Sequence, residues 1–171
     1  RRQRQMCIRD SVYPGMEATN DQVVFETSVF NSDFRFGGLP QLHLDVTPAG
    51  PGGSIYALME DCSAENECIH IGHAIMDLRY HEGGTEYQNI IPGVEIRAKM
   101  EFFAMDVLIP EGHKIRLSLR DIGEDYLPPS TEAAVDISIS GNSVLRIHEI
   151  NTDGKIFFEP PVCMHEDCLS E

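Results

Sequence analysis

The cysteines are the first residues of this chain whose spacing could support chemistry. Four of the five form two close pairs, Cys62 with Cys68 and Cys163 with Cys168. Both pairs are candidate disulfides, as in exported proteins, and the alternative is four ordinary thiols. A disulfide across so short a loop removes little chain entropy, so it would staple a loop rather than hold the fold. The Cys163–Cys168 stretch also carries soft metal ligands, but a disulfide or a disordered end is favoured there.

Histidines are the next candidates. His113 directly follows a turn glycine and precedes an alternating strand, which favours a structural hydrogen bond over a catalytic role. His70, His73 and His81 look like metal ligands. In a regular strand, however, His70 and His73 fall on opposite faces, so a shared metal is geometrically poor.

A serine nucleophile of the hydrolase type needs a Gly-x-Ser-x-Gly elbow, and this chain has no such string. The segment Gly141-Asn142-Ser143 lacks the second glycine, and we interpret it as a hairpin turn. The sequence therefore predicts no catalytic residue, no cofactor and no metal site in this chain.

The sequence predicts mainly β-strands, and these strands must position the cysteine, histidine and serine residues described above. Apolar and polar residues alternate, or β-branched residues cluster, over about nine segments separated by turns rich in Gly, Pro, Asn and Asp. No window predicts a sustained amphipathic helix. This pattern predicts an all-β fold, an antiparallel jelly-roll β-sandwich. The predicted strands cover residues 22–27, 41–46, 54–60, 68–80, 95–109, 114–120, 135–140, 144–150 and 155–158.

The long segment Glu95–Ile109 changes phase at its centre. Its apolar series runs from Ile96 to Phe102 and then restarts one residue out of step at Phe103, continuing to Ile109. A one-residue slip of this kind indicates a bulge or a bend where a strand changes sheet.

The chain is acidic, with a formal net charge of −15 over 171 residues and only three lysines. Such a surface repels phosphate, which argues against nucleic acid and anionic membranes as partners. The acidic residues are spread along the sequence, which favours a solvated surface over a calcium site. The sequence has no apolar run of membrane-spanning length.

The first ten residues, RRQRQMCIRD, match one reading frame of a transposase adapter used in sequencing libraries. We therefore interpret residues 1–11 as adapter-derived and expect the protein to continue upstream. The rival interpretation is a basic arm for nucleic acid. The remaining chain divides into a jelly-roll β-sandwich at residues 12–158 and an acidic, cysteine-containing tail at 159–171. The compartment stays open, although the cysteine pairs slightly favour an exported protein.

Several ordered motifs carry a family resemblance. They are Glu26-Thr27 followed by Gly38-Leu39-Pro40, then Pro92-Gly93 before a strand, and GHKIRLSL beginning at Gly112. In this order and spacing the chain, over Asp21–Ile150, resembles the C-terminal β-sandwich of the X-Pro dipeptidyl-peptidase and cocaine-esterase family of serine α/β-hydrolases, a galactose-binding-domain-like jelly roll. Lys114 replaces the usual arginine, and the cysteine loop is unusual for the family.

The resemblance implies that the chain is a non-catalytic accessory domain. Its partner would be an upstream α/β-hydrolase domain of the same chain, with a Ser-Asp-His triad that acts on X-Pro peptides or acyl esters and amides. This domain would pack on the catalytic domain, shape its cleft and be compatible with a homodimer. None of the triad residues has a counterpart here.

Two other functions stay open. Jelly rolls also serve as carbohydrate-binding modules, but these usually offer exposed aromatic platforms, and this chain has no Trp and places most Phe residues on predicted core faces. A purely structural oligomerisation domain fits the sequence equally well.

Overall fold

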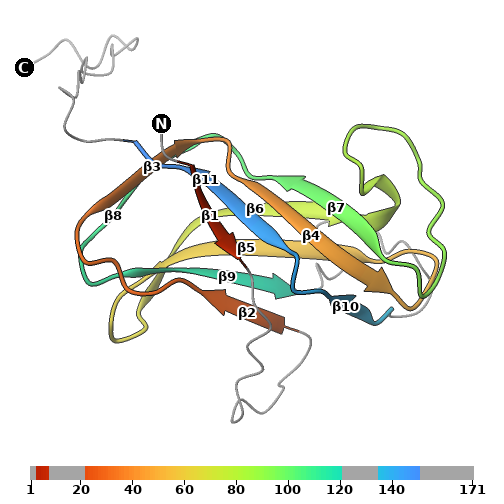
Figure 1. Cartoon of the computed structure of the whole chain (residues 1–171), viewed down its shortest axis with the longest axis horizontal. Coiled ribbons are helices and arrows are strands. Elements are labelled where there is room, and N and C mark those ends of the chain that lie inside the picture. The colour runs from red at the N-terminus through yellow and green to blue at the C-terminus, as the bar shows by residue number, and fades with distance from the viewer. Residues whose placement is uncertain (1–2, 8–21, 121–134, 151–171) are drawn as a thin grey trace, which may run out of the picture.

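The computed structural model describes residues 3–7, 22–120 and 135–150. Every paired strand in this part of the chain is antiparallel, and the strands form two packed sheets with a short third one (Figure 1). The described residues contain no α-helix. The predicted all-β sandwich of jelly-roll type is therefore confirmed.

The larger sheet is built around β4 (Gln41–Pro48). Strand β7 (Ile96–Glu101) pairs with one edge of β4, while β10 (Ile137–Ile139) and β11 (Val144–His148) pair with the other. Strand β1 (Gln3–Cys7) extends this sheet beyond β11. Strand β4 buries alternate side chains, as its alternating sequence predicts.

The predicted hairpin turn at Gly141-Asn142-Ser143 is wrong, because β10 and β11 on either side of it do not pair with each other. Both strands run antiparallel to the same edge of β4, so they form one interrupted strand from which a tight turn bulges. The Ser143 hydroxyl supports this turn, because Oγ accepts the backbone N–H of Asp45 at 3.0 Å and donates to the carbonyl of Ser140 at 3.0 Å.

The second sheet has the order β2 (Gln22–Glu26), β9 (Lys114–Arg120), β5 (Ser54–Cys62) and β6 (Cys68–Asp77). The strand predicted to reach Tyr80 ends at Asp77 instead. Its carboxylate accepts the backbone N–H of Arg79 at 2.9 Å and so caps the 3-10 turn η1 (Leu78–Tyr80).

The predicted phase slip after Phe102 is a change of sheet. Strand β7 pairs with β4, whereas β8 (Met105–Ile109) pairs with β3 (Phe34–Gly38) in a separate two-stranded sheet. The slip leaves Phe102 buried but Phe103 77% exposed. The placement of Phe103 in the second apolar series was therefore wrong, because it lies on the crossover between the two sheets.

The core fills the space between the two sheets. It is made of aliphatic, methionine and phenylalanine side chains from the facing strands, and most are less than 5% exposed. The largest fully buried members are Phe36, Phe102, Leu42, Leu44, Met59, Leu78 and Met100. Burial of this apolar area is the main favourable contribution to folding, so the face of each strand that joins the core is fixed by its apolar series.

The segment interpreted as adapter-derived takes part in this structure. Residues Gln3–Cys7 pair with β11 in the register Gln3 to His148 through Cys7 to Val144. An exposed sheet edge accepts almost any extended segment, since pairing uses backbone groups alone. The strand is thus compatible with either origin of these residues, and the adapter interpretation stays a prediction.

Candidate functional site

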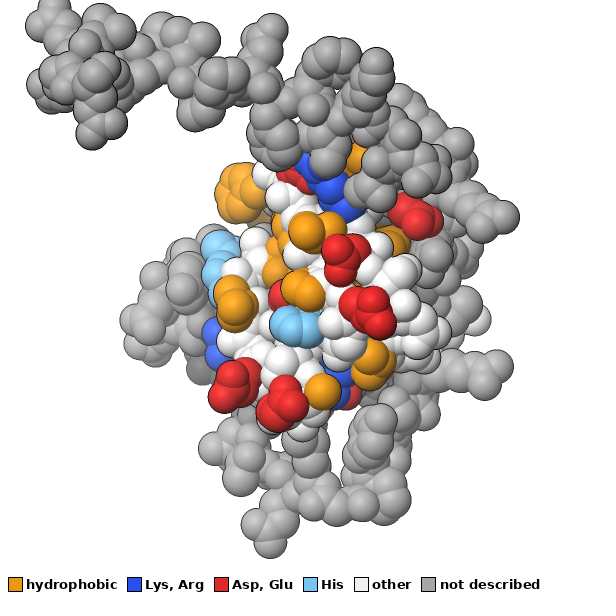
Figure 2. All heavy atoms as spheres, turned by 90° about the vertical axis from the view of Figure 1, so that its left-hand side faces the viewer, with side chains coloured by type: hydrophobic (Ala, Val, Ile, Leu, Met, Phe, Trp, Pro, Cys, Tyr) orange, Lys and Arg blue, Asp and Glu red, His pale blue; other side chains and the backbone are white. Residues whose placement is uncertain are grey.

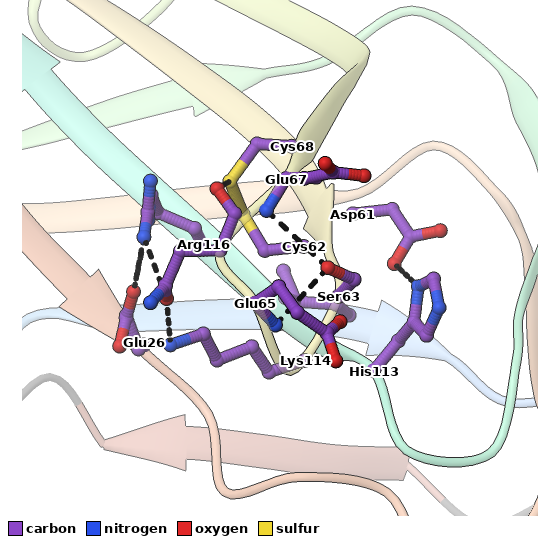
Figure 3. Close-up of a disulfide and its surroundings, with 12 residues drawn as sticks. Glu26, Asp61, Cys62, Ser63, Glu65, Glu67, Cys68, His113, Lys114 and Arg116 are labelled. Atoms are coloured by element: carbon purple, nitrogen blue, oxygen red, sulfur yellow. Dashed lines mark hydrogen bonds and ion pairs between the residues drawn. A yellow bond between two sulfur atoms is a disulfide. The ribbon is translucent and has the colours of Figure 1, made fainter.

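The closed end of the β5–β6 hairpin holds the cysteine pair (Figure 3). Cys62 and Cys68 are register partners at the last position of the hairpin ladder, and the structure joins them in a disulfide that spans six positions of sequence. Cys62 is fully buried. The second candidate pair, Cys163 and Cys168, lies outside the described residues.

The loop inside this disulfide has a defined internal structure. The Ser63 hydroxyl accepts the backbone N–H groups of Glu65 at 3.2 Å and Glu67 at 3.3 Å. Asn66 adopts a left-handed conformation with φ of 63°, which asparagine tolerates better than most residues. The loop is therefore shaped by its own backbone contacts as well as by the disulfide.

A group of charged residues ties this loop to β2 and β9. Lys114 Nζ donates to Glu26 and to the side-chain oxygen of Asn66, both at 2.8 Å, and Arg116 Nε donates to Glu26 at 2.9 Å. Burial alone would raise the pKa of Glu26, but the hydrogen bonds from Lys114 and Arg116 outweigh it and lower that pKa. These contacts link the loop to two strands, β2 and β9, and Figure 3 shows Lys114 and Arg116 directed at Glu26 beside the hairpin end.

His113 lies on the turn before β9 and contacts Asp61 of β5. Its Nδ1 is 2.8 Å from Asp61 Oδ1, and both side chains are mostly buried. Figure 3 shows the ring directed at this carboxylate. This contact ties the turn before β9 to β5, and it is a side-chain hydrogen bond of the kind predicted for His113. Ser63 is near in sequence to Asp61, but its hydroxyl is already engaged with backbone N–H groups.

His70 and His73 do not lie on opposite faces. Their rings stack with centroids 5.4 Å apart, and His73 Nδ1 is 3.4 Å from His70 Nε2. A β-bulge causes this, because Met59 pairs with Gly72 while Glu60 pairs with His70, which leaves Ile71 as an extra residue. The isolated glycine within the strand was the signal that could have predicted the bulge.

The bulge brings His73 into a row of rings on the outer face of the second sheet. His73 stacks on Tyr56 at 5.4 Å and meets the edge of Phe103 at 6.2 Å. The guanidinium carbon of Arg120 lies 4.7 Å from the centroid of the Tyr56 ring. His81 is not part of this row, and its Nδ1 lies 3.0 Å from the carbonyl oxygen of Leu78.

The end of the sandwich formed by β3 and β8 presents a mixed surface. Figure 2 looks onto this side, and apolar side chains there alternate with Asp and Glu rather than forming one continuous patch. Within the described part of the chain, no helix has the length and hydropathy needed to cross a membrane.

Chemically, these groups hold strands together. The hydroxyls of Ser63 and Ser143 are occupied by backbone groups, and Gly141-Asn142-Ser143 is a turn within a strand rather than a nucleophile elbow. The cluster that sequence reasoning missed is Glu60 beside Cys62 and Cys68, whose ligand atoms all lie within 4.8 Å of one another. Strand alternation places Glu60 and Cys62 on one face, and that spacing could have revealed the cluster.

The solved structures most similar in fold include three hydrolases. An aminopeptidase from the marine sediment archaeon Thaumarchaeota archaeon superposes with a TM-score of 0.67 at 13% identity, over 85% of this chain and 28% of that one. A CocE/NonD family hydrolase from Staphylococcus aureus gives 0.63 at 12%, over 76% and 30%. An alpha-amino acid ester hydrolase gives 0.58 at 14%, over 83% and 25%.

At these identities the structural likeness shows the fold, and this chain spans less than a third of each of these proteins. None of the curated proteins compared with the chain matches it. The family comparison is more specific, because residues 5–149 match the model described as the X-Pro dipeptidyl-peptidase C-terminal non-catalytic domain. That match covers most of the sequence, including both main sheets, so the chain belongs to the family of X-Pro dipeptidyl-peptidase C-terminal non-catalytic domains.

Proposed function

We propose that this chain is the accessory domain of a serine hydrolase acting on X-Pro peptides or on acyl esters and amides. In this proposal it packs on the catalytic domain of the same protein and forms one wall of the substrate cleft. The observation that carries the proposal is the family match over residues 5–149 to a domain described as non-catalytic.

Two further observations support it. The similar structures are named as an aminopeptidase, a CocE/NonD family hydrolase and an ester hydrolase, and in each this fold accounts for 25–30% of the chain. The remainder of such a protein is large enough to hold a catalytic domain. Within this chain, the groups that could be mistaken for catalytic ones, His113 and Ser143, make contacts that join strands.

The first test concerns the non-catalytic half of the proposal. The purified chain is assayed with Ala-Pro-nitroanilide and with a nitrophenyl acyl ester, against buffer and a heat-unfolded sample. We expect rates equal to the controls. Turnover by the folded chain that is lost on treatment with a serine-directed inhibitor would show a nucleophile in this domain and overturn the proposal.

The second test concerns the cleft. The natural gene, with its upstream region, is expressed in full and also as two separate pieces that are then mixed. We expect the full protein to hydrolyse one of the substrate classes, and the catalytic piece alone to have a raised KM that added accessory domain lowers. An unchanged KM in the absence of this domain would contradict a role in shaping the cleft. Light scattering of the full protein would show whether it is a homodimer.

The carbohydrate-binding alternative has one specific observation in its favour. Phe103 is an exposed aromatic side chain beside His73, and sugar rings commonly pack on exposed aromatic rings. Binding to a glycan array that is lost in Phe103→Ala and retained in Tyr87→Ala, another exposed aromatic residue, would favour this function instead.

A further inference from the structure

We infer that the Cys62–Cys68 pair is a redox-controlled metal site. When the disulfide is reduced, its two thiolates and the carboxylate of Glu60 bind a thiophilic divalent cation such as Zn²⁺. The inference begins from geometry, because a Glu60 oxygen lies within 4.8 Å of both sulfur atoms of the bonded pair. Once the disulfide is reduced, the two sulfur atoms can separate while they stay beside this carboxylate. Their distance from the carboxylate suits donors that share one small cation.

The β5–β6 ladder explains why these donors converge. Cys62 pairs with Cys68, and Glu60 pairs with His70. Residues two apart on a strand share a face, so two adjacent cross-strand pairs present four side chains side by side. The bulge begins beyond these pairs, between Met59 and Glu60, and so leaves their alignment intact.

His70 is the fourth candidate ligand, although its ring nitrogens lie outside the group of Glu60, Cys62 and Cys68 and its side chain would have to turn to join them. It is the register partner of Glu60, and cross-strand partners place their Cβ atoms about 4.5–5.5 Å apart. Its Nε2 faces His73 at 3.4 Å, so Nδ1 is the nitrogen we assign to the metal. Two sulfurs, one oxygen and one nitrogen make a four-coordinate donor set of the kind that zinc accepts.

The surrounding charges suit a dithiolate. Lys114 of β9 is the register partner of Cys62, and Arg116 is the partner of Glu60. A nearby cation favours the thiolate form of cysteine. Zn²⁺ with two thiolates and one carboxylate would carry a net charge of −1, which these cations balance. Lys114 stays close to the hairpin end through its hydrogen bond to Asn66 at 2.8 Å.

The two states exclude each other because both use the same sulfur atoms. Two molecules of a low-molecular-weight thiol reduce the disulfide, becoming a disulfide themselves while each protein sulfur gains one electron and one proton. The cation then displaces the two thiol protons. The hairpin end is therefore closed by a covalent bond under oxidising conditions and by a metal under reducing ones.

The test uses the whole chain with Cys7, Cys163 and Cys168 replaced by Ser, so that only the hairpin thiols remain. Reduced and oxidised samples, freed of reductant without oxygen, are titrated with Co²⁺ to detect thiolate-to-metal charge-transfer absorption. Zn²⁺ affinity is then measured against a chromophoric chelator. We expect one equivalent bound to the reduced protein with a Kd of about 1 µM or tighter, and binding to the oxidised protein at least ~100-fold weaker.

Substitutions identify the ligands. Glu60→Gln should weaken Zn²⁺ binding by about 10-fold or more, and Cys68→Ser should abolish the charge-transfer band of the pair. Glu65→Gln, in the same loop but outside the cluster, is the matched control and should bind as the parent does. Circular dichroism of each metal-free variant checks that it is folded.

Three results would overturn the inference. They are the absence of Zn²⁺ binding to the folded, reduced protein, equal affinity of the oxidised protein, and unchanged affinity in Glu60→Gln. The last keeps the test decisive even where a cysteine variant fails to fold, because Glu60 lies on the partly exposed outer face. The inference is independent of the proposed hydrolase function, since its readout is metal binding by this chain alone.

Discussion

Asp45 shows how a single buried charge is held in this fold. Its carboxylate is 7% exposed and accepts two hydrogen bonds from Arg97, both at 2.6 Å. The hydrogen bonds from Arg97 lower the pKa of Asp45 against the opposing effect of burial. The backbone of Asp45 also supports the turn between β10 and β11 through Ser140 and Ser143. Removing the Arg97 guanidinium should therefore lower the free energy of unfolding, because the buried carboxylate loses its hydrogen-bond donor.

We predict that Arg97→Gln lowers the free energy of unfolding at pH 7, because the nearly buried carboxylate of Asp45 loses both of its hydrogen bonds from Arg97. Because the pKa of Asp45 is lower in the folded state, its contribution is present above about pH 4, the unfolded pKa, and is lost as the pH falls through the folded value. Denaturant unfolding between pH 7 and 3 checks this, with the exposed Lys99→Gln on the same strand as control. The difference in free energy of unfolding between Arg97→Gln and the parent chain should shrink toward pH 3. A difference that stays constant would contradict this explanation.

Replacing two buried serines, Ser118 and Ser143, should have opposite effects on stability. The Ser118 hydroxyl is buried and, within the described part of the chain, has no hydrogen-bond partner. Ser118→Ala should therefore be neutral or stabilise the chain by up to about 1 kcal/mol, whereas Ser143→Ala should destabilise it by about 1–2 kcal/mol because Asp45 N–H loses its acceptor. Thermal unfolding of both variants is the measurement, and a Ser118→Ala variant less stable than Ser143→Ala would contradict it.

At the scale of elements, most strands could be predicted from alternation alone. Strands β4, β5 and β9 bury the faces that their sequences predict, and the sheet change after β7 follows from the phase slip. The predicted strand at residues 155–158 lies outside the described residues. Strand β3 was missed, because its alternation of Phe34 and Phe36 with Arg35 is only three residues long and ends in two glycines, and its strand form depends on pairing with β8. The Arg35–Asp106 ion pair, across these two strands, depends on tertiary structure that local sequence does not encode.

The missed site features have the same physical origin. A bulge reverses which residues share a face, so the contact between His70 and His73 could not follow from simple alternation. The prediction of a hairpin turn at Gly141 was wrong for a related reason. A turn sequence does not show whether the chain reverses or continues along the same neighbouring strand, and here it continues along β4.

The turns give an element-scale prediction. Gly112 ends the Pro-Glu-Gly turn before β9 with φ of 85° and open space around it, while Gly141 has open space without a positive φ. Gly112→Ala should cost about 1–2 kcal/mol of stability from backbone strain, and Gly141→Ala should change stability by less than about 0.5 kcal/mol. Chemical denaturation of both variants compares them. Equal effects would show that the conformation of Gly112 is not what makes glycine necessary there.

At the scale of the whole molecule, the described part of the chain is a sandwich whose polar contacts tie strands, turns and loops together. The charged network of Glu26, Lys114 and Arg116 joins the hairpin end to two strands, and the family match covers both main sheets. The central claim of the proposed function is that this domain supplies surface and rigidity to a neighbouring catalytic domain.

The most direct test of that claim is to determine the natural coding sequence upstream of residue 12 from the source DNA. The account predicts an α/β-hydrolase domain there, with a Gly-x-Ser-x-Gly elbow followed by an Asp and a His before this sandwich begins. An upstream region that contains a secretion signal joined directly to the sandwich, with no hydrolase domain, would contradict it and favour a free-standing binding module.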